Sequence, residues 1–398
     1  MNRPDSASLR RALADQLEQG GVLRTPAWRK AIEAVPRELF LPSFFRAEPG
    51  PGGITQYIPV TQDTQEDERL ALVYQNETWV TQLDGHLTAD TTVRPVTGFP
   101  TSSSTVPSTV VEMLESLDVD DGMNVLEIGT GTGYSTALMC HRLGEDNVTS
   151  VEVDHAVSER ADAALEDAGY STWTVTGDGL LGHPRRAPYD RVIATCALRR
   201  IPYAWVRQTR PGGIILATVG PSAWSYGTGL AKLTVKDDGS AVGRIIGRTS
   251  FMPARAEAAV PLSGDLSARA AYADTERNTS LSPDVLNDWM PAFLAQLAAP
   301  GTQLVRAVSD SRETVYLFDP GREAFAALTT AGDRWNVRQG GPVAIWDAIE
   351  SALTAWRNAG EPDITSVRLE VTPEAHAYWI GDEPPLRWKH SHAPLMSN

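Results

Sequence analysis

Three glycines and an acidic residue at the end of an apolar run form the strongest chemical signal in this sequence. Gly129, Gly131 and Gly133 follow the run Val125–Ile128, in which Glu127 completes an E-x-G-x-G-x-G pattern. The first glycine allows a sharp turn off a strand, and the other two let backbone approach a ligand without a Cβ in the way. A helix that starts at once offers free N–H groups. The pattern indicates a site for a nucleotide-type cofactor.

Glycine spacing and two further acidic residues favour S-adenosylmethionine over a dinucleotide. The third glycine comes two residues after the second, not three as in dinucleotide loops. Glu127 is placed to face the cofactor's ammonium group. Glu152 ends the next strand, where ribose hydroxyls would lie, and Asp178 ends the third, near the adenine. The alternative is that the glycines only form a tight strand-to-helix turn and bind no ligand. Three acids in register at the ends of strands disfavour this alternative. The predicted cofactor-binding residues are Glu127, Gly129, Thr130, Gly131, Gly133, Glu152, Asp178 and Gly179.

Alternating strands and helices must position these residues. The apolar runs predict strands at 124–129, 148–153, 172–176, 191–195 and 214–219. The helical patterns between and before them fall at 108–117, 134–143, 156–168 and 203–210. This alternation predicts an α/β fold, with a parallel sheet and helices on both faces. An antiparallel hairpin formed by Leu233–Val235 and Val242–Ile246 is expected to close the sheet.

The flanking regions have a different pattern. Residues 6–20 and 27–35 predict helices, 78–83 a strand, and 48–64 and 84–104 turn-rich segments. Beyond residue 250, helices at 283–297 and 343–358 and several short strands, the last at 367–371, predict an α+β region. We therefore expect three parts. Residues 1–100 hold N-terminal helices and substrate-side loops, 101–250 the cofactor-binding domain, and 251–398 a C-terminal α+β region that is a candidate for peptide recognition.

Composition excludes some classes of protein. The 398 residues include 35 Lys and Arg against 50 Asp and Glu, a net charge of −15, which argues against a general nucleic-acid binder. No run of 18 apolar residues and no signal-peptide pattern occurs, so we expect no membrane span and a cytoplasmic location. Cys140 and Cys196 lack metal-ligand spacing, and no metal site is predicted. His390 and His392 are predicted to lie in a C-terminal tail.

A longer block downstream resembles a known family. The G-D-G-x-x-G-x-P-x-x-A-P-Y-D pattern at 177–190 and the motif Arg210–Gly213 are similar to protein-L-isoaspartate O-methyltransferases, as are Ala34–Pro42 and Ser104–Pro107. The resemblance covers residues 27–220. It implies a Rossmann-like domain that binds S-adenosylmethionine and methylates a side-chain carboxylate of a peptide.

Three departures from the family pattern concern the acceptor. The hydroxyl before the first helix is a serine in the family and Thr105 here, preceded by Thr101–Ser104 instead of glycine and glutamine. The segment between Trp79 and Ser104 is longer, and the chain continues far beyond Gly220. A long C-terminal region resembles homologues associated with ribosomally made peptides (graspetides, lanthipeptides and lasso peptides). In those systems the ester of an aspartate collapses to an aspartimide.

The predicted chemistry places few demands on the protein. A carboxylate is already ionised at neutral pH, so the site must position it and exclude water rather than supply a strong base. Hydroxyl groups can hold a carboxylate without burying a full positive charge. Thr105 is therefore the first catalytic candidate, with Ser104 and Ser103 beside it, although a solvated hydroxyl-rich loop is the alternative.

Three functions remain open from the sequence. The first is esterification of an aspartate in a modified precursor peptide, giving an aspartimide that persists or hydrolyses to isoaspartate. The second is general repair of isoaspartate in damaged proteins. The third is a protein that binds the cofactor without turnover, which the intact acids Glu127, Glu152 and Asp178 disfavour.

Overall fold

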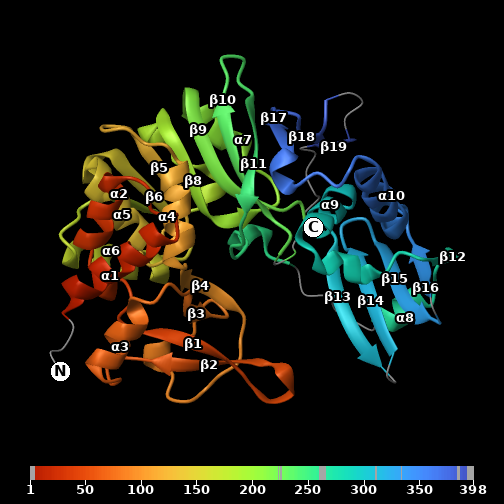
Figure 1. The fold of residues 1–398 in the computed structure, drawn as a ribbon, viewed down its shortest axis with the longest axis horizontal. Helices are drawn as coiled ribbons and strands as arrows, with labels where there is room; N and C mark the ends of the chain where they lie inside the picture. The colour runs from red at the N-terminus through yellow and green to blue at the C-terminus, as the bar shows by residue number, and fades with distance from the viewer. Residues whose placement is uncertain are drawn as a thin grey trace. The chain divides into compact units, whose positions relative to one another are not determined.

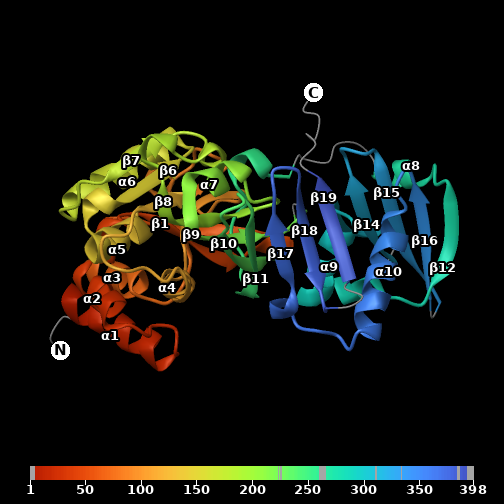
Figure 2. The same cartoon turned by 90° about the horizontal axis from the view of Figure 1, so that it is seen from above.

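The chain forms two compact units in a computed structural model (Figures 1 and 2). The structure describes residues 5–222, 224, 226–259, 266–309, 312–332, 334–382 and 386–391. The first unit comprises Met1–Thr195 and Ala204–Leu216, and the second comprises Cys196–Tyr203 and Ala217–Asn398. The three parts expected from sequence, 1–100, 101–250 and 251–398, divide the chain elsewhere and stay a prediction about its functional organisation.

A parallel sheet forms the centre of the first unit. Its strands are β5 (Val125–Ile128), β6 (Val148–Glu152), β7 (Trp173–Thr176), β8 (Tyr189–Leu198) and β9 (Thr209–Val219), in the order β9-β8-β5-β6-β7. Helix α4 (Pro107–Ser116) precedes the first of them, and α5 (Tyr134–Leu143), α6 (His155–Asp167) and α7 (Tyr203–Gln208) lie between successive strands. All residues of β5 and β6 are buried. Because successive side chains of a strand point to opposite faces, both faces of the sheet are covered, and the predicted α/β fold is confirmed.

A second, antiparallel sheet precedes this one in the chain. Its strands β1 (Phe44–Pro49), β2 (Thr55–Val60), β3 (Trp79–Leu83) and β4 (Pro100–Ser104) run in the order β2-β1-β3-β4. Helices α1 (Ser6–Gln19), α2 (Pro26–Ala34) and α3 (Glu66–Val73) belong to the same region. The prediction of turn-rich segments at 48–64 and 84–104 was wrong in part, because strands occupy both. Gly and Pro concentrate in the β1–β2 turn, while Phe45 and Tyr57 pack with Leu83 and Ala89 in a small core.

The second unit begins with the predicted hairpin, β10 (Gly229–Val235) and β11 (Ala241–Arg248). Strands β17 (Arg368–Val371), β18 (Ala375–Ile380) and β19 (Leu386–Ser391) extend it in the order β10-β11-β17-β18-β19. The expectation that 367–371 is the last strand was wrong. His390 lies in β19, is 8% exposed and bonds through Nε2 to the Leu297 carbonyl oxygen at 2.9 Å. His392 lies outside the described residues.

A five-stranded antiparallel sheet completes the second unit. Strands β12 (Thr275–Thr279), β13 (Gln303–Ser309), β14 (Arg312–Asp319), β15 (Ala324–Ala331) and β16 (Arg334–Gly340) run in the order β12-β16-β15-β14-β13. Helices α8 (Leu266–Ala270), α9 (Trp289–Ala298) and α10 (Ile345–Asn358) accompany it. Alternate residues such as Val315, Leu317 and Leu328 are fully buried, as are Trp346 and Leu353 of α10. The predicted α+β character is confirmed.

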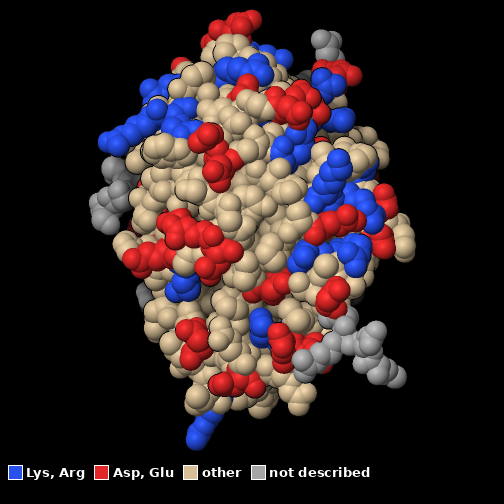
Figure 3. Space-filling view, turned by 90° about the vertical axis from the view of Figure 1, so that its left-hand side faces the viewer, with Lys and Arg blue, Asp and Glu red and all other residues tan. Residues whose placement is uncertain are grey.

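Figure 3 shows the charged side chains on one face of the molecule. On the face shown in Figure 3, acidic and basic side chains of the described residues are interspersed. In the described parts of the chain, no helix has both the length and the apolar character needed to cross a bilayer.

Two glycines of β11 give a matched test of the β10–β11 packing. A Cβ on Gly243 would lie 1.9 Å from the Lys232 carbonyl oxygen, whereas nothing lies within 4 Å of one on Gly247. Because backbone must move to admit a methyl group, Gly243→Ala is expected to lower the free energy of unfolding by about 2 kcal/mol or more. Gly247→Ala should change it little. Urea denaturation of both variants measures the difference, and equal stabilities would contradict the strand pairing described.

Candidate active site

The glycine loop joins β5 to α5, and its three glycines have left-handed backbone conformations. Gly129, Gly131 and Gly133 have φ angles of 95°, 56° and 87°, values that residues other than glycine rarely adopt. At Gly129 space is also limiting, since a Cβ would lie 2.9 Å from the Thr195 hydroxyl oxygen. That hydroxyl donates to the Gly129 carbonyl oxygen at 2.5 Å. The hydrogen bond from Thr195 therefore fixes the start of the loop, and the loop ends at the first turn of α5.

Glu127 lies beneath this loop and is fully buried. Its carboxylate accepts hydrogen bonds from the hydroxyls of Ser135 (2.5 Å), Thr136 (2.5 Å) and Ser150 (2.8 Å). Burial raises the pKa of Glu127, and these three donors oppose that rise. The carboxylate thus ties the start of α5 to β6. The Thr130 hydroxyl is 2.7 Å from the Ser150 hydroxyl in the same cluster. The predicted contact of Glu127 with a cofactor ammonium group stays a prediction.

The parallel register brings the other two predicted acids to the same edge of the sheet. Glu152 ends β6, and its neighbour in register, Thr176, ends β7 two residues before Asp178. Glu152 accepts the Gly131 N–H at 3.0 Å and the Asp154 N–H at 3.1 Å. Asp178 is exposed and caps a short 3-10 turn by accepting the Leu180 N–H at 2.9 Å.

Two neighbours of these acids have roles that are visible only in three dimensions. Gly179 is buried, and a Cβ there would lie 2.5 Å from Cγ2 of Ile128, so packing alone requires a glycine. Val153, which sequence reasoning missed, directly follows Glu152 and is 47% exposed. An apolar side chain left half exposed at the ligand-binding edge of a parallel sheet is suited to covering a flat ring. The signal in the sequence was its position after the strand-end acid.

The predicted hydroxyl residues meet the glycine loop at the end of β4. The Ser103 carbonyl oxygen is 3.6 Å from the position that a Cβ on Gly131 would take. Ser103 and Thr105 are half-buried, whereas Ser104 is 3% exposed and accepts a hydrogen bond from Arg37 Nη2 at 3.3 Å. The structure thus places Ser103 beside the loop, whereas Ser104 and the Thr105 carbonyl oxygen contact Arg37. Their catalytic role stays a prediction.

Arg37 is the main feature that sequence reasoning missed. It is fully buried and donates to the carbonyl oxygens of Val73 (2.6 Å), Gln75 (2.9 Å), Glu77 (3.3 Å) and Thr105 (3.5 Å). No ion pair joins it to an acid among the described residues. Burial lowers the pKa of Arg37 to about 10, so it keeps its proton at neutral pH. A lone arginine inside the apolar block Ala34–Pro42 was the available signal.

A line of hydrogen bonds connects β4 with the strand-end acid Glu152. The Thr101 hydroxyl donates to Oε1 of Gln82 at 2.7 Å, and Nε2 of Gln82 donates to Oδ2 of Asp154 at 3.1 Å. The Asp154 N–H in turn donates to Glu152. Gln82 is 1% exposed, so its hydrogen bonds are shielded from water. The line of bonds fixes the position of the antiparallel sheet relative to the parallel sheet of this unit.

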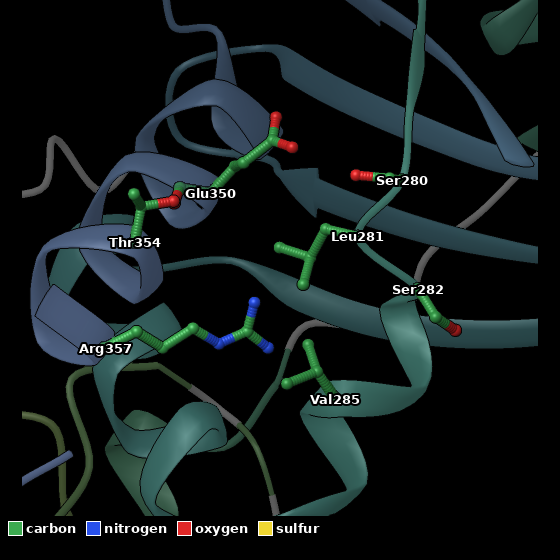
Figure 4. A pocket seen from close by; sticks show the side chains of 7 residues that line it. All are labelled: Ser280, Leu281, Ser282, Val285, Glu350, Thr354 and Arg357. Atoms are coloured by element: carbon green, nitrogen blue, oxygen red, sulfur yellow. The ribbon is translucent and has the colours of Figure 1, made fainter. Parts of the chain in front are cut away.

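A separate cavity of about 300 Å³ lies in the second unit and has different chemistry (Figure 4). Its lining comprises Ser280, Leu281, Ser282, Val285, Glu350, Thr354 and Arg357. Glu350 is already bonded to Arg277 and to the Thr279 hydroxyl, each at 2.5 Å. The cavity has no glycine loop and no strand-end acids, so it does not compete with the loop of the first unit as a cofactor site.

The parallel sheet, with a glycine loop after its strand β5, defines a Rossmann-like fold. Residues 77–259 match the family Protein-L-isoaspartate(D-aspartate) O-methyltransferase (PCMT). A Hyperthermus butylicus protein-L-isoaspartate O-methyltransferase is 30% identical over 221 residues, 53% of this chain and 75% of that protein. One from Thermococcus onnurineus is 35% identical over 161 residues, 40% and 71% of the two chains. The chain belongs to the protein-L-isoaspartate O-methyltransferase family, whose members use S-adenosylmethionine.

Other matches are shorter. The Ignicoccus hospitalis protein-L-isoaspartate O-methyltransferase is 38% identical over 136 residues, 34% of this chain and 64% of that protein. A Methanococcus maripaludis enzyme of the same name is 43% identical over 110 residues, 27% of this chain. This chain therefore spans 64% and 52% of the lengths of these two relatives.

The C-terminal region has a counterpart in a solved structure. A protein-L-isoaspartate O-methyltransferase with 24% sequence identity has a TM-score of 0.51, and the match covers 96% of this chain and 98% of that one. At this identity the similarity establishes the fold alone. It corrects one premise of the sequence analysis: an enzyme of this name also continues beyond its methyltransferase sheet. The long extension therefore does not by itself favour a peptide-tailoring role.

The two strand-end acids give a test of the cofactor site. Glu152→Ala and Asp178→Ala each remove an acceptor at the predicted ribose and adenine positions. Each is expected to weaken S-adenosylmethionine binding about tenfold or more. Glu166→Ala, at an exposed position of α6, is the matched control and should bind normally. Isothermal titration calorimetry measures the three affinities, and unchanged binding by both site variants would refute the assignment.

Arg37 gives a second test, of stability. Arg37→Met keeps the apolar stem but leaves four carbonyl oxygens, including that of buried Val73, without their donor. The free energy of unfolding is expected to fall by about 3 kcal/mol. Arg160→Met, at an exposed position of α6, should fall within about 0.5 kcal/mol of the wild type. Denaturant titration followed by circular dichroism compares them, and equal losses would mean that Arg37 has no special structural role.

Proposed function

We propose that this protein is an S-adenosylmethionine-dependent methyltransferase that esterifies isoaspartyl carboxylates in proteins and peptides. One observation carries the proposal: the Ser103 backbone at the end of β4 lies against Gly131 of the glycine loop. A hydroxyl-rich segment and a cofactor-type loop are thereby adjacent in a chain of the isoaspartyl methyltransferase family. The names of its relatives support the choice of acceptor.

The residues of the loop fit the proposed cofactor. The backbone at Gly131 and Gly177 leaves room for close approach, since nothing lies within 3.5 Å of a Cβ at the first or within 4 Å at the second. Glu152 and Asp178 present carboxylate oxygens, which suit the hydroxyl and amino donors of an adenosine. Val153 offers an exposed apolar surface next to Glu152. When bound, S-adenosylmethionine supplies an electrophilic methyl group on a sulfonium.

The acceptor chemistry then follows from charge. An isoaspartyl carboxylate is ionised at neutral pH, so its oxygen can attack the methyl carbon directly. With S-adenosylmethionine held at the loop, its sulfonium would supply the methyl group to this oxygen and leave as the thioether, so the protein would need no group to take up a proton. Thr105 is proposed to orient the carboxylate through its hydroxyl. Ser103 is the neighbouring donor, and Ser104, buried against Arg37, supports the backbone of the segment.

A narrower function was expected from the sequence, namely aspartate esterification in a ribosomally made, modified peptide. The altered segment Thr101–Thr105 and the longer stretch from Trp79 to Ser104 still support it. The C-terminal region no longer does, because the solved relative has one as well. Isoaspartyl methylation of general protein substrates is therefore the better supported proposal. The assay that tests it also distinguishes it from the peptide-tailoring function.

The decisive assay uses the purified full-length chain, S-adenosylmethionine with a labelled methyl group, and two unmodified peptides. The peptides have one sequence and differ only in an isoaspartyl or aspartyl residue. We expect base-labile methyl ester on the isoaspartyl peptide alone. Methylation restricted to a macrocyclic precursor peptide would favour tailoring. Cofactor binding without transfer to any of these would refute both enzymatic functions.

Thr105 gives a test of the acceptor side. Thr105→Val keeps the shape and removes the hydroxyl, and kcat is expected to fall about 10²-fold while S-adenosylmethionine binding stays unchanged. Thr105→Ser should retain most of the activity, since it restores the hydroxyl. Thr109→Val, on the adjoining helix α4, controls for loss of a nearby hydroxyl. Full turnover by Thr105→Val would assign the orienting role elsewhere.

A further inference from the structure

The second unit contains a cavity that the proposed function does not use. Its volume of about 300 Å³ lies at the lower end of the range of small-molecule sites. Figure 4 shows it between helix α10 and the segment that joins β12 to the short 3-10 helix Pro283–Asn287. Glu350, Thr354 and Arg357 lie on one face of α10, since three or four residues separate them along the helix. All of the lining residues belong to one compact unit.

Hydrogen bonds fix the two walls of this cavity relative to each other. Arg277 of β12 donates to Oε2 of Glu350 at 2.5 Å, and the Thr279 hydroxyl donates to Oε1 of the same carboxylate at 2.5 Å. The Thr279 hydroxyl oxygen also accepts the Leu281 N–H at 3.0 Å. The segment that carries Leu281 is therefore tied to α10, and the cavity is preformed, which lowers the entropic cost of binding a ligand.

Arg357 gives the cavity a positive charge. In the described parts of the chain no acidic side chain forms an ion pair with Arg357, and Glu350, the acid of the lining, is already paired with Arg277. A cation is favourable in the last turn of a helix for its charge alone. In Figure 4, however, the guanidinium extends from α10 toward Leu281 and Val285 of the opposite wall. The charges favour an anion with a single negative charge, because the Glu350 carboxylate repels a second one.

The rest of the lining suits an aliphatic group. Leu281 and Val285 are half-buried, and an apolar group that covers them would leave water. The planar guanidinium matches a carboxylate through two parallel hydrogen bonds. A second cavity, of about 530 Å³, shares Glu350 and Thr354 with the first and continues along the same helix. It leaves room for a longer molecule attached to the bound group.

We propose that this cavity binds a carboxylate with a neighbouring branched aliphatic group, the chemistry of a polypeptide chain that ends in an aliphatic residue. Arg357 pairs with the carboxylate, and Leu281 and Val285 contact the aliphatic side chain. The residues before the chain end lie over the second cavity. The site does not depend on the proposed methyl transfer, because its residues belong to the second unit and the glycine loop belongs to the first.

The test titrates the full-length protein with N-acetyl-L-leucine, followed by ligand-observed NMR. A Kd of roughly 1 mM is expected for so small a molecule. N-acetyl-L-leucinamide, which lacks the negative charge, should bind about tenfold more weakly. Arg357→Gln should weaken binding of the acid by a similar factor, because the charge-assisted pair is lost. Arg357→Lys keeps the charge but not the planar fork and should give an intermediate affinity. Leu281→Ala should weaken N-acetyl-L-leucine about threefold to fivefold and leave N-acetylglycine, which has no aliphatic side chain, unchanged.

Two variants serve as controls. Arg334→Gln removes an exposed arginine of β16 that is not part of the lining, and Thr105→Val alters the hydroxyl segment of the first unit. Both should bind N-acetyl-L-leucine as the wild type does. Equal affinities of the wild type for the acid and the amide would overturn the proposal, as would unchanged binding by Arg357→Gln. The comparison of acid and amide uses wild-type protein alone, so it decides the question even if a variant does not fold.

Two longer comparisons distinguish the sources of the ligand. A heptapeptide with a free C-terminal leucine represents a polypeptide chain end, and 4-methylpentanoate represents a small free acid. Tighter binding of the heptapeptide supports the site as one for chain ends, and tighter binding of 4-methylpentanoate supports it as one for free acids. Failure of methyl transfer to isoaspartyl peptides would refute the proposed function alone, since these titrations need neither S-adenosylmethionine nor an isoaspartyl group.

Discussion

The Glu152 carboxylate divides its two oxygens between the N–H groups of Gly131 and Asp154, and the geometry of the site depends on this division. One bond holds the glycine loop over the edge of the sheet. The other fixes the start of α6, where Asp154 also caps the helix and accepts from Gln82. A single strand-end acid thus connects the loop, a helix and the acceptor-side strand. Because Glu152 is 8% exposed, these bonds face little competition from water.

Two buried polar groups with different chemistry support this arrangement. Glu127 is an anion surrounded by hydroxyl donors, and Arg37 is a cation surrounded by carbonyl acceptors. Among the described residues, no opposite charge stabilises either group. The neutral dipoles of hydroxyl groups stabilise Glu127, and those of carbonyl groups stabilise Arg37. Dipoles from fixed backbone and short side chains hold a charge in one place, as a site that must position reacting atoms requires. Directional hydrogen bonds offset the free-energy cost of burying these two charges. They also make the structure around the glycine loop rigid.

The sequence predicts the parallel sheet closely and the antiparallel sheet β2-β1-β3-β4 poorly. Strands such as β5 and β6 are short apolar runs followed by glycines or acids, so local pattern and tertiary role agree. In the antiparallel sheet they conflict: Gly, Pro and hydroxyl residues of β1, β2 and β4 indicate turns, and only long-range pairing makes them strands. Arg37 was missed for the same reason. Its partners lie 36 to 68 residues away along the chain, beyond any local pattern. His390 likewise becomes a core residue only when β18 and β19 pair.

The position of Arg37 in the chain has a consequence for how a minimal domain could be defined. The family match begins at residue 77, yet the guanidinium that supports Ser104 and Thr105 lies forty residues earlier. A fragment trimmed to the matched boundaries would keep the glycine loop, Glu152 and Asp178. It would lose β1, the neighbour of β3, together with the cation beneath the hydroxyl segment. The boundaries of the family match here enclose the glycine loop and the strand-end acids, while the support of the hydroxyl segment comes from both sides of residue 77.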